Sequence, residues 1–167
     1  MLILALESSA SPASVAVCSG KELLGLYYQN TGLTHSRTLL AMAESLLRNL
    51  DISVKDVDLF AVARGPGSFT GVRIGVAAAK GLAWGADKPV CGVSTLQAIA
   101  LQAPVPGVTL CPVMDARRSQ VYNAIFSWRG GTLSRLCDDR AISLEGLTAG
   151  LKPQAPTGPV SCLATAP

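Results

Sequence analysis

Residues 64–73 have the sequence Arg64-Gly65-Pro66-Gly67-Ser68-Phe69-Thr70-Gly71-Val72-Arg73. They join an apolar run typical of a buried strand to a run of small residues with helical character. Three glycines within seven residues let the backbone adopt positive φ and approach another surface closely, while Pro66 restricts one φ angle. Such a strand-to-helix loop offers backbone N–H groups to an anion, so it is the first candidate for a binding site.

Neither of two familiar phosphate-loop patterns matches this loop. A Walker A loop needs Gly-Lys-Ser/Thr after four free positions, but Val72 and Arg73 follow Gly71. A dinucleotide-binding fingerprint that starts at Gly65 needs glycine at position 70, which is Thr70. An ordinary tight turn between strand and helix therefore stays open as the alternative.

The composition indicates a globular α/β protein. The chain has 167 residues, of which 49% are hydrophobic and 15% charged, enough for one domain or two small lobes. Aromatic residues make up only 5%, so we expect a core of Ala, Val, Leu and Ile, typical of helices packed on a sheet. The net charge of +3 is small and the basic residues are scattered, so any RNA contact would need a partner.

The cysteines and the apolar runs predict a soluble cytoplasmic protein with no membrane contact. Five cysteines are widely spaced without a C-x-x-C pair, which favours free, reduced thiols. The first residues lack the basic start of a signal peptide, and Glu7 interrupts their apolar run. No run approaches the ~18 apolar residues of a membrane span.

The first part of the chain predicts a β-meander followed by alternating helices and strands. Short apolar runs broken by Ser, Pro and Gly predict the opening strands. Apolar residues at 39, 40, 43, 46, 47 and 50 follow the spacing of an amphipathic helix, with Thr34 or Ser36 as its N-cap. The predicted strands are 2–6, 14–18, 23–28, 57–63 and 90–93, and the predicted helices are 36–50, 71–84 and 95–102.

The helix predicted at 71–84 is unusually slim because it is rich in alanine and glycine. A slim helix can pack closely on a sheet of its own chain or on a helix of a partner, and the sequence leaves both alternatives open. Phe69 is expected to form an apolar knob at the tip of the loop before it.

The second part of the chain repeats the opening plan after a linker at 103–107. We expect strands at 108–114, 120–128 and 132–136, a turn at 115–119 and a helix at 143–151. In that turn, Asp115 with Arg117 and Arg118 predicts either a local ion pair or a contact across the cleft between the lobes. Repeated prolines after position 152 predict an irregular tail. We therefore expect a first lobe at 1–103, an incomplete second lobe at 108–151 and a tail at 152–167.

This order of elements is the plan of the actin-like ATPase superfamily, the ASKHA or RNase H-like fold, and the motifs resemble the TsaB family, also called YeaZ. The resemblance covers roughly residues 1–150. The motifs that carry it are Glu7-Ser8-Ser9, Thr34-His35-Ser36, residues 64–73, Gly92-Val93-Ser94-Thr95-Leu96 and Met114-Asp115-Ala116-Arg117.

The resemblance implies a noncatalytic partner of TsaD, which transfers threonylcarbamoyl to adenosine in tRNAs that read ANN codons. It also implies that TsaE, an ATPase, joins the assembly, that tRNA binds only through the complex, and that the chain forms a homodimer when alone. No intrinsic cofactor and no independent activity are expected, and ATP or ADP with magnesium would bind in the complex with TsaD and TsaE.

The same resemblance places the glycine loop and the slim helix at the partner interface. Their glycines are then expected to serve close approach to TsaD or to a second copy of the chain. The predicted interface residues are Arg64, Gly65, Pro66, Gly67, Ser68, Phe69, Thr70, Gly71, Arg73 and Ala77.

Two departures from the wider family bear on function. TsaD-like enzymes carry a His-x-x-x-His metal pair, but His35 is the only histidine in this sequence, which argues against the catalytic subunit. Members of the TsaB family usually have aspartate where Glu7 stands. Glu7, Ser8 and Ser9 are the candidates for a nucleotide or metal remnant, with capping of their own turn as the alternative.

Two further hypotheses stay open at this point. An independent ATPase or sugar-kinase-like enzyme would need a second phosphate loop, for which the residues after 108 offer only Gly130-Gly131. The chain is shorter than its relatives and residues 152–167 do not resemble a TsaB C-terminus, so truncation or an altered reading frame after about residue 150 is a second hypothesis.

Overall fold

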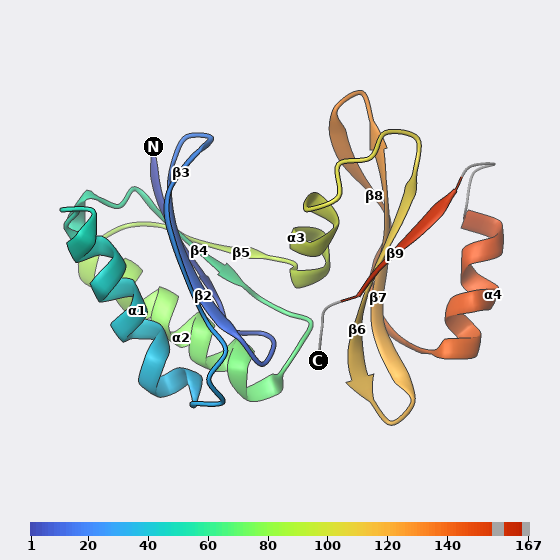
Figure 1. Cartoon of the computed structure of the whole chain (residues 1–167), viewed down its shortest axis with the longest axis horizontal. Coiled ribbons are helices and arrows are strands. Elements are labelled where there is room, and N and C mark those ends of the chain that lie inside the picture. Colours follow the sequence, from blue (N-terminus) through green and yellow to red (C-terminus); the bar gives the residue numbers. More distant parts are fainter. Residues whose placement is uncertain (155–158, 165–167) are drawn as a thin grey trace. The chain divides into compact units, whose positions relative to one another are not determined.

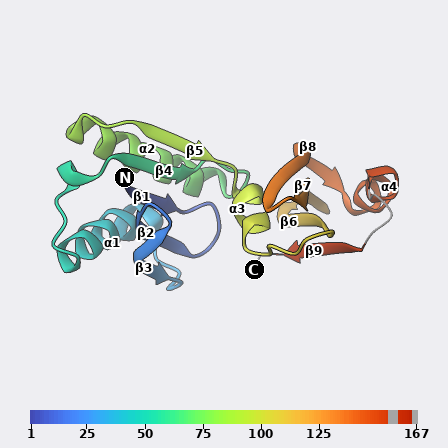
Figure 2. The same ribbon diagram turned by 90° about the horizontal axis from the view of Figure 1, so that it is seen from above.

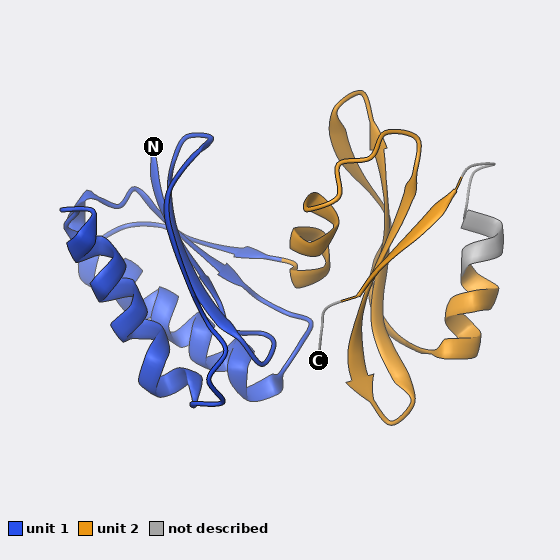
Figure 3. Cartoon of the chain, in the orientation of Figure 1, with its two compact units in different colours: residues 1–93 blue, residues 94–167 orange. Residues whose placement is uncertain are grey.

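The structure, a computed structural model, describes residues 1–154 and 159–164, with residues 151–154 as backbone only (Figure 1). The chain divides into two compact units, Met1–Val93 and Ser94–Pro167 (Figure 3). No helix among the described residues is long and apolar enough to cross a membrane.

The first unit is a five-stranded sheet with two helices on one face (Figure 1). Its strand order is β3-β2-β1-β4-β5, in which β1, β2 and β3 pair antiparallel while β1, β4 and β5 pair parallel. The elements are β1 (Leu2–Glu7), β2 (Ala13–Ser19), β3 (Glu22–Gln29), α1 (His35–Asn49), a 3-10 turn (Val54–Asp56), β4 (Leu59–Ala63), α2 (Phe69–Ala86) and β5 (Val90–Val93).

Alternation along the strands and periodicity along the helices build the core of this unit. Alternate residues of β1, β2 and β4 turn toward the helices, because successive strand side chains point to opposite faces. Helix α1 buries Leu39, Met42, Ala43, Leu46 and Leu47 against them, which confirms the predicted amphipathic helix. Thr34 is its N-cap, although its side chain makes no capping hydrogen bond.

The second unit is a four-stranded sheet in the order β8-β7-β6-β9, with β6 and β9 parallel. Figure 2 shows α3 and α4 on opposite sides of this sheet. The elements are α3 (Thr95–Leu101), β6 (Thr109–Arg117), β7 (Gln120–Arg129), β8 (Thr132–Ser143), α4 (Leu144–Gln154) and β9 (Val160–Ala164).

The structure corrects the predicted boundaries in two places. Helix α3 belongs to the second unit, where it contacts β6 and β7, so the division falls at Val93 rather than after residue 103. The tail expected to be irregular contains β9, because its backbone pairs in parallel with β6 from Val160 onward. Prolines did not exclude this strand, since Pro159 directly precedes it.

Two strands also extend beyond their predicted ends. β6 continues to Arg117, through most of the expected turn at 115–119. β8 continues to Ser143 rather than ending at 136, because register shifts against β7 absorb irregularities in its polar second half. The residues that form the turn between β6 and β7 are therefore fewer than predicted.

Candidate functional site

The glycine loop packs directly on the turn between β1 and β2. A Cβ added at Gly71 would lie 2.0 Å from the carbonyl oxygen of Ser8, and one at Gly67 would lie 2.3 Å from that of Ser9. A Cβ at Gly75, one turn further along α2, would lie 2.5 Å from the Ser8 hydroxyl. Any side chain at these positions would separate the loop from the turn, so glycine is required for this contact.

Hydrogen bonds fix the same contact. The backbone N–H of Ser68 donates to the carbonyl oxygen of Ser9 at 2.6 Å, and the Ser8 hydroxyl donates to the carbonyl oxygen of Gly71 at 2.9 Å. His35 Nε2 lies 2.9 Å from the carbonyl oxygen of Ala10 and donates to it, so the start of α1 is tied to the same turn. Gly67 and Gly71 therefore serve close approach within the chain, where the sequence predicted approach to a partner.

Glu7, Ser8 and Ser9 are engaged within this contact. Ser8 and Ser9 are each 1% exposed, and Glu7 Oε1 accepts a hydrogen bond from the Ser9 backbone N–H. This is the turn-capping arrangement that the sequence left open. No cluster of three or more His, Cys, Asp or Glu side chains within residues 1–150 and 159–164 could hold a metal ion. A nucleotide or metal role for these residues stays a prediction.

Helix α2 presents opposite faces to the sheet and to solvent. Its buried residues are Gly71, Gly75, Ala79 and Ala83, so the small side chains do pack on its own sheet. Ser68 caps the helix by accepting a hydrogen bond from the Gly71 backbone N–H at 3.3 Å. The opposite face carries an exposed stripe made of Phe69, Arg73, Ala77, Lys80, Gly81 and Trp84.

Two aromatic side chains end this stripe. Phe69 is 69% exposed and Trp84 is 86% exposed. The Arg73 guanidinium stacks over the Phe69 ring, 3.6 Å from its centroid, which holds both side chains at the N-terminal end of the helix. A Cβ at Gly81, one turn before Trp84, would meet nothing within 4 Å, so the stripe is open at that position.

Of the ten predicted interface residues, some pack against the chain itself and the others are exposed to solvent. Gly65 and Gly71 are buried, and Pro66 and Gly67 are half-buried against the chain itself. The remaining six are exposed: Arg64, Ser68, Phe69, Thr70, Arg73 and Ala77. Sequence reasoning missed Lys80, Gly81 and Trp84, although their spacing of three, four and seven residues from Ala77 could have indicated the same helix face.

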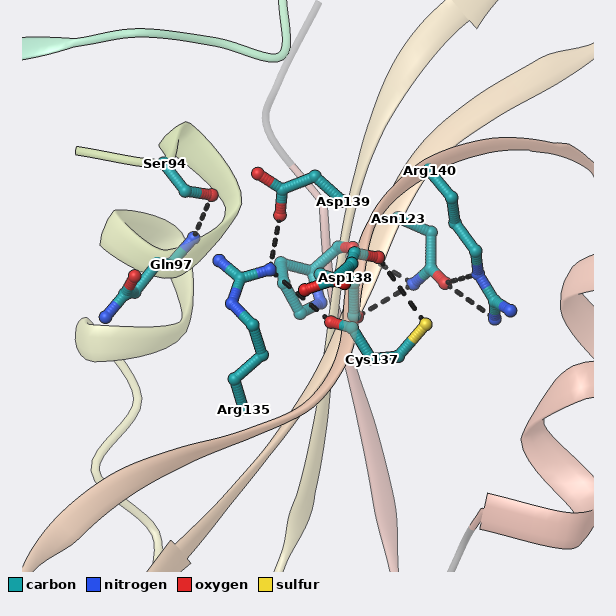
Figure 4. A network of polar contacts seen from close by, with 10 residues as sticks. Ser94, Gln97, Asn123, Arg135, Cys137, Asp138, Asp139 and Arg140 are labelled. Carbon is teal, nitrogen blue, oxygen red and sulfur yellow. Dashed lines mark hydrogen bonds and ion pairs between the residues drawn. The ribbon is translucent and has the colours of Figure 1, made fainter. Parts of the chain in front are cut away.

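The second unit contains a polar network in its core (Figure 4). The Asn123 side chain is fully buried, donating to Cys111 Sγ at 3.1 Å and to the carbonyl oxygen of Ala124 at 2.9 Å. Its Oδ1 accepts from the Arg140 guanidinium at 3.2 Å. Burial, reinforced by the adjacent Cys162 thiol, raises the pKa of Cys111 to about 12. The network joins three neighbouring strands and leaves Cys111 an inert thiol.

A second group in that unit joins β8 to β7. Arg135 forms a 2.6 Å ion pair with Asp139 (Figure 4). Its guanidinium also lies over the ring of Phe126, 4.6 Å from the ring centroid. Both charged side chains are about a quarter exposed. These contacts satisfy charges on the sheet surface, so we assign them to the stability of the unit.

Known proteins match both the sequence and the fold of the chain. A family model for TsaD, tRNA N6-adenosine threonylcarbamoyltransferase, matches residues 25–162. The tRNA threonylcarbamoyladenosine biosynthesis protein TsaB of Bacillus subtilis is 35% identical over 91% of this chain and 66% of its own length. TsaB of Escherichia coli is 38% identical over 73% of this chain and 53% of its own. The chain belongs to the TsaB (YeaZ) family.

Solved structures agree with this family. YeaZ from Pseudomonas aeruginosa superposes with a TM-score of 0.80 and 27% identity, covering 99% of this chain and 84% of that one. Component A of the (R)-2-hydroxyglutaryl-CoA dehydratase of Acidaminococcus fermentans has a TM-score of 0.53 and 13% identity, over 86% of this chain and 48% of that one. The predicted actin-like fold class is confirmed. The chain spans between 52% and 66% of the length of the curated TsaB relatives.

Proposed function

We propose that this chain is a noncatalytic partner subunit of a TsaD-type transferase in the threonylcarbamoyladenosine modification of tRNAs that read ANN codons. The names of the TsaB relatives support the pathway. The observation that carries the partner role is the exposed stripe on α2, with Phe69 and Trp84 at its two ends.

The shape of the stripe suits the docking of another helix. Ala77 and Gly81 present almost no side chain, so a second helix could approach at the short end of the usual 8–10 Å axial separation. Phe69 and Trp84 are fifteen residues apart, or about 22 Å along the helix axis, which is enough for four turns of a partner. Exposed aromatic residues are typical anchors of protein interfaces.

Charge on the rim indicates the chemistry of that partner helix. Arg73 and Lys80 lie on the exposed face of α2 among its small residues, and α2 has no acidic residue in its first turn. A partner helix with small or apolar residues at its centre and carboxylates at its edges would complement this surface. In the proposal that helix belongs to the TsaD-type subunit, and a second copy of the chain uses the same surface when that subunit is absent.

The noncatalytic assignment rests on the β1–β2 turn. This turn holds the candidates for a nucleotide or metal remnant, and the glycine loop of the same chain packs on the carbonyl oxygens of Ser8 and Ser9 there. The Ser8 hydroxyl donates to the carbonyl oxygen of Gly71, which supports a structural role for this turn. ATP or ADP with magnesium, and TsaE, enter the proposal only with the assembled cytoplasmic complex.

Binding to the purified TsaD-type subunit tests the proposal. We expect Phe69→Ala and Trp84→Ala each to weaken the interaction by roughly tenfold or more, as interface anchors do, and Arg73→Glu to weaken it through charge. Tyr28→Ala, which removes an exposed aromatic side chain from β3, is the matched control and should bind normally. Undiminished binding by both aromatic variants would remove α2 from the interface.

Reconstituted transfer tests the noncatalytic role separately. The chain alone should transfer no threonylcarbamoyl, and it should restore transfer when added to TsaD, TsaE and the enzyme that makes the adenylate. Light scattering should detect a homodimer that an excess of TsaD disperses. Tight binding of ATP and magnesium by the isolated chain in a calorimeter would favour the ATPase alternative instead.

A further inference from the structure

The turn between β6 and β7 has an unusual backbone for its residues. Arg117 pairs with Gln120 across the hairpin, which leaves Arg118 and Ser119 as a two-residue turn. The φ angles of Arg117, Arg118 and Ser119 are 64°, 52° and 58°, all in the left-handed region. Two-residue turns with positive φ at both positions strongly prefer Asn-Gly or Gly-Gly, because other side chains are strained there.

The neighbouring hairpin in the same unit has glycine at the turn positions with positive φ, where it causes no strain. Between β7 and β8, Arg129 pairs with Thr132 and the turn is Gly130-Gly131, with φ angles of 57° and 77°. Figure 1 shows the two turns at opposite ends of the hairpin strands. The β6–β7 turn therefore holds three side chains in a conformation that glycine adopts in the β7–β8 turn. Strain of this kind is retained where the side chains have a task.

The side chains at this tip are hydrogen-bond donors directed to solvent. Arg117, Arg118, Ser119 and Gln120 are all exposed, and no ion pair among the described residues involves either arginine. The Asp115 carboxylate accepts a hydrogen bond from the Arg117 backbone N–H at 2.7 Å, which braces the turn from within. The local ion pair expected from the sequence is therefore replaced by a side-chain-to-backbone contact, and both guanidinium groups stay available.

We infer that this tip, residues 117–120, contacts the phosphodiester backbone of RNA. Arginine, serine and glutamine side chains are the groups that proteins use for phosphate contacts. A protein partner would be expected to meet an apolar or aromatic anchor, and these four residues supply none. The inference rests on the proposed function, which makes tRNA the substrate of the assembled complex. Two arginines form too small a site to bind RNA tightly alone, so the contact adds to those of the transferase subunit.

Substitutions at the turn separate charge from strain. Arg118→Asn combined with Ser119→Gly, the Asn-Gly variant, creates the preferred turn sequence and removes one guanidinium. Ser119→Gly alone relieves strain and keeps both guanidinium groups. Both variants should unfold at a higher temperature, by about 2–4 °C for each relieved position, because glycine adopts positive φ without strain. Arg117→Ala with Arg118→Ala removes both charges. Arg129→Ala, at the far end of β7, controls for general loss of positive charge.

Affinity for a tRNA transcript is measured as a function of salt, with the chain alone and with the chain bound to the TsaD-type subunit. The double arginine variant should bind roughly tenfold more weakly at low salt, and its slope of log affinity against log salt should fall by about 0.7–0.9 for each lost contact. The Asn-Gly variant removes one guanidinium instead of two, so its slope should change by about half as much as that of the double arginine variant. Ser119→Gly and Arg129→Ala should bind as the native chain does.

Two results would overturn the inference. One is equal tRNA affinity of the native chain and the double arginine variant, both alone and bound to the TsaD-type subunit. The other is the absence of tRNA binding by the native chain in both of these states. Binding of every variant to the TsaD-type subunit is measured in parallel. Normal subunit binding with unchanged tRNA affinity removes the RNA contact alone, whereas failure of the native chain to bind the subunit removes the proposed function itself.

Discussion

Substituting Gly71 by alanine should destabilise the first unit. The added Cβ would lie 2.0 Å from the Ser8 carbonyl oxygen and 3.2 Å from the carbonyl carbon, whereas real Cβ atoms essentially never come closer than 3.0 Å to another heavy atom. Both contacts are backbone, so the β1–β2 turn or the start of α2 must move by about 1 Å or more. A change of this kind at a buried position typically costs about 1–3 kcal/mol.

Hydrogen bonds add to that cost and helix propensity reduces it. The Ser8 hydroxyl bond to Gly71 and the Ser68 backbone bond to Ser9 span the same contact, and losing both would cost about 2 kcal/mol. Alanine gains about 1 kcal/mol over glycine inside a helix. We therefore expect Gly71→Ala to lower the free energy of unfolding by about 2–4 kcal/mol.

Alanine at two further glycines of α2 would meet different surroundings from alanine at Gly71. Gly75→Ala would meet the Ser8 hydroxyl at 2.5 Å, so adding Ser8→Ala should recover much of its loss. The same second substitution should not rescue Gly71→Ala, whose obstruction is a carbonyl group. Gly81→Ala meets nothing within 4 Å and should stabilise the chain by about 1 kcal/mol.

Urea unfolding followed by circular dichroism measures each of these free energies, with the native chain and Gly81→Ala as references. If Gly71→Ala were as stable as Gly81→Ala, the loop would not pack on the β1–β2 turn. Equal rescue of Gly71→Ala and Gly75→Ala by Ser8→Ala would contradict the distinction between carbonyl and hydroxyl obstruction.

Three predictions concern the second unit. Because the pKa of Cys111 is raised from 9.0 to about 12, the folded thiol keeps its proton where the unfolded one loses it, so stability present below pH 9 should fall between pH 9 and 12. The slope should be at most about 1.4 kcal/mol per pH unit and should be absent from Cys111→Ala in urea titrations at pH 8, 9 and 10. Ser127 Oγ is buried without a hydrogen-bond partner among the described residues, so Ser127→Ala should raise the free energy of unfolding by about 1 kcal/mol. Asn123→Ala should lower it by about 2–4 kcal/mol in the same assay, because it leaves the Arg140 guanidinium without its acceptor, and a neutral result would contradict the network.

Local pattern was sufficient for the elements whose residues lie close in sequence. The apolar spacing from Leu39 to Leu50 predicted a helix at 36–50, and α1 occupies His35–Asn49. The strand before the glycine loop and the helix after it were also predicted at their observed places, with ends that differ by a few residues. Side-chain periodicity depends only on neighbours within one element, so it can be read without the fold.

Contacts between segments that are distant in the sequence could not be predicted from the periodicity within one element. Ser8 and Gly71 are separated by 63 positions, and nothing in either motif states that they touch. The tail was predicted to be irregular because its composition is proline-rich, but β6 supplied an unpaired edge that satisfies the backbone of β9. Whether a segment pairs in a sheet depends on a partner strand that is distant in the sequence, so the pattern of the segment itself does not reveal it.

For the glycine loop, the sequence by itself determined that residues 64–73 form a tight strand-to-helix connection with glycine where a close approach is needed. Only the tertiary structure decided what is approached. The parallel pairing of β1 with β4 brings the β1–β2 turn beside the loop, so Gly67 and Gly71 face Ser9 and Ser8. The helix that follows must turn its slim buried side to the sheet, which leaves Phe69 and Trp84 on the outside.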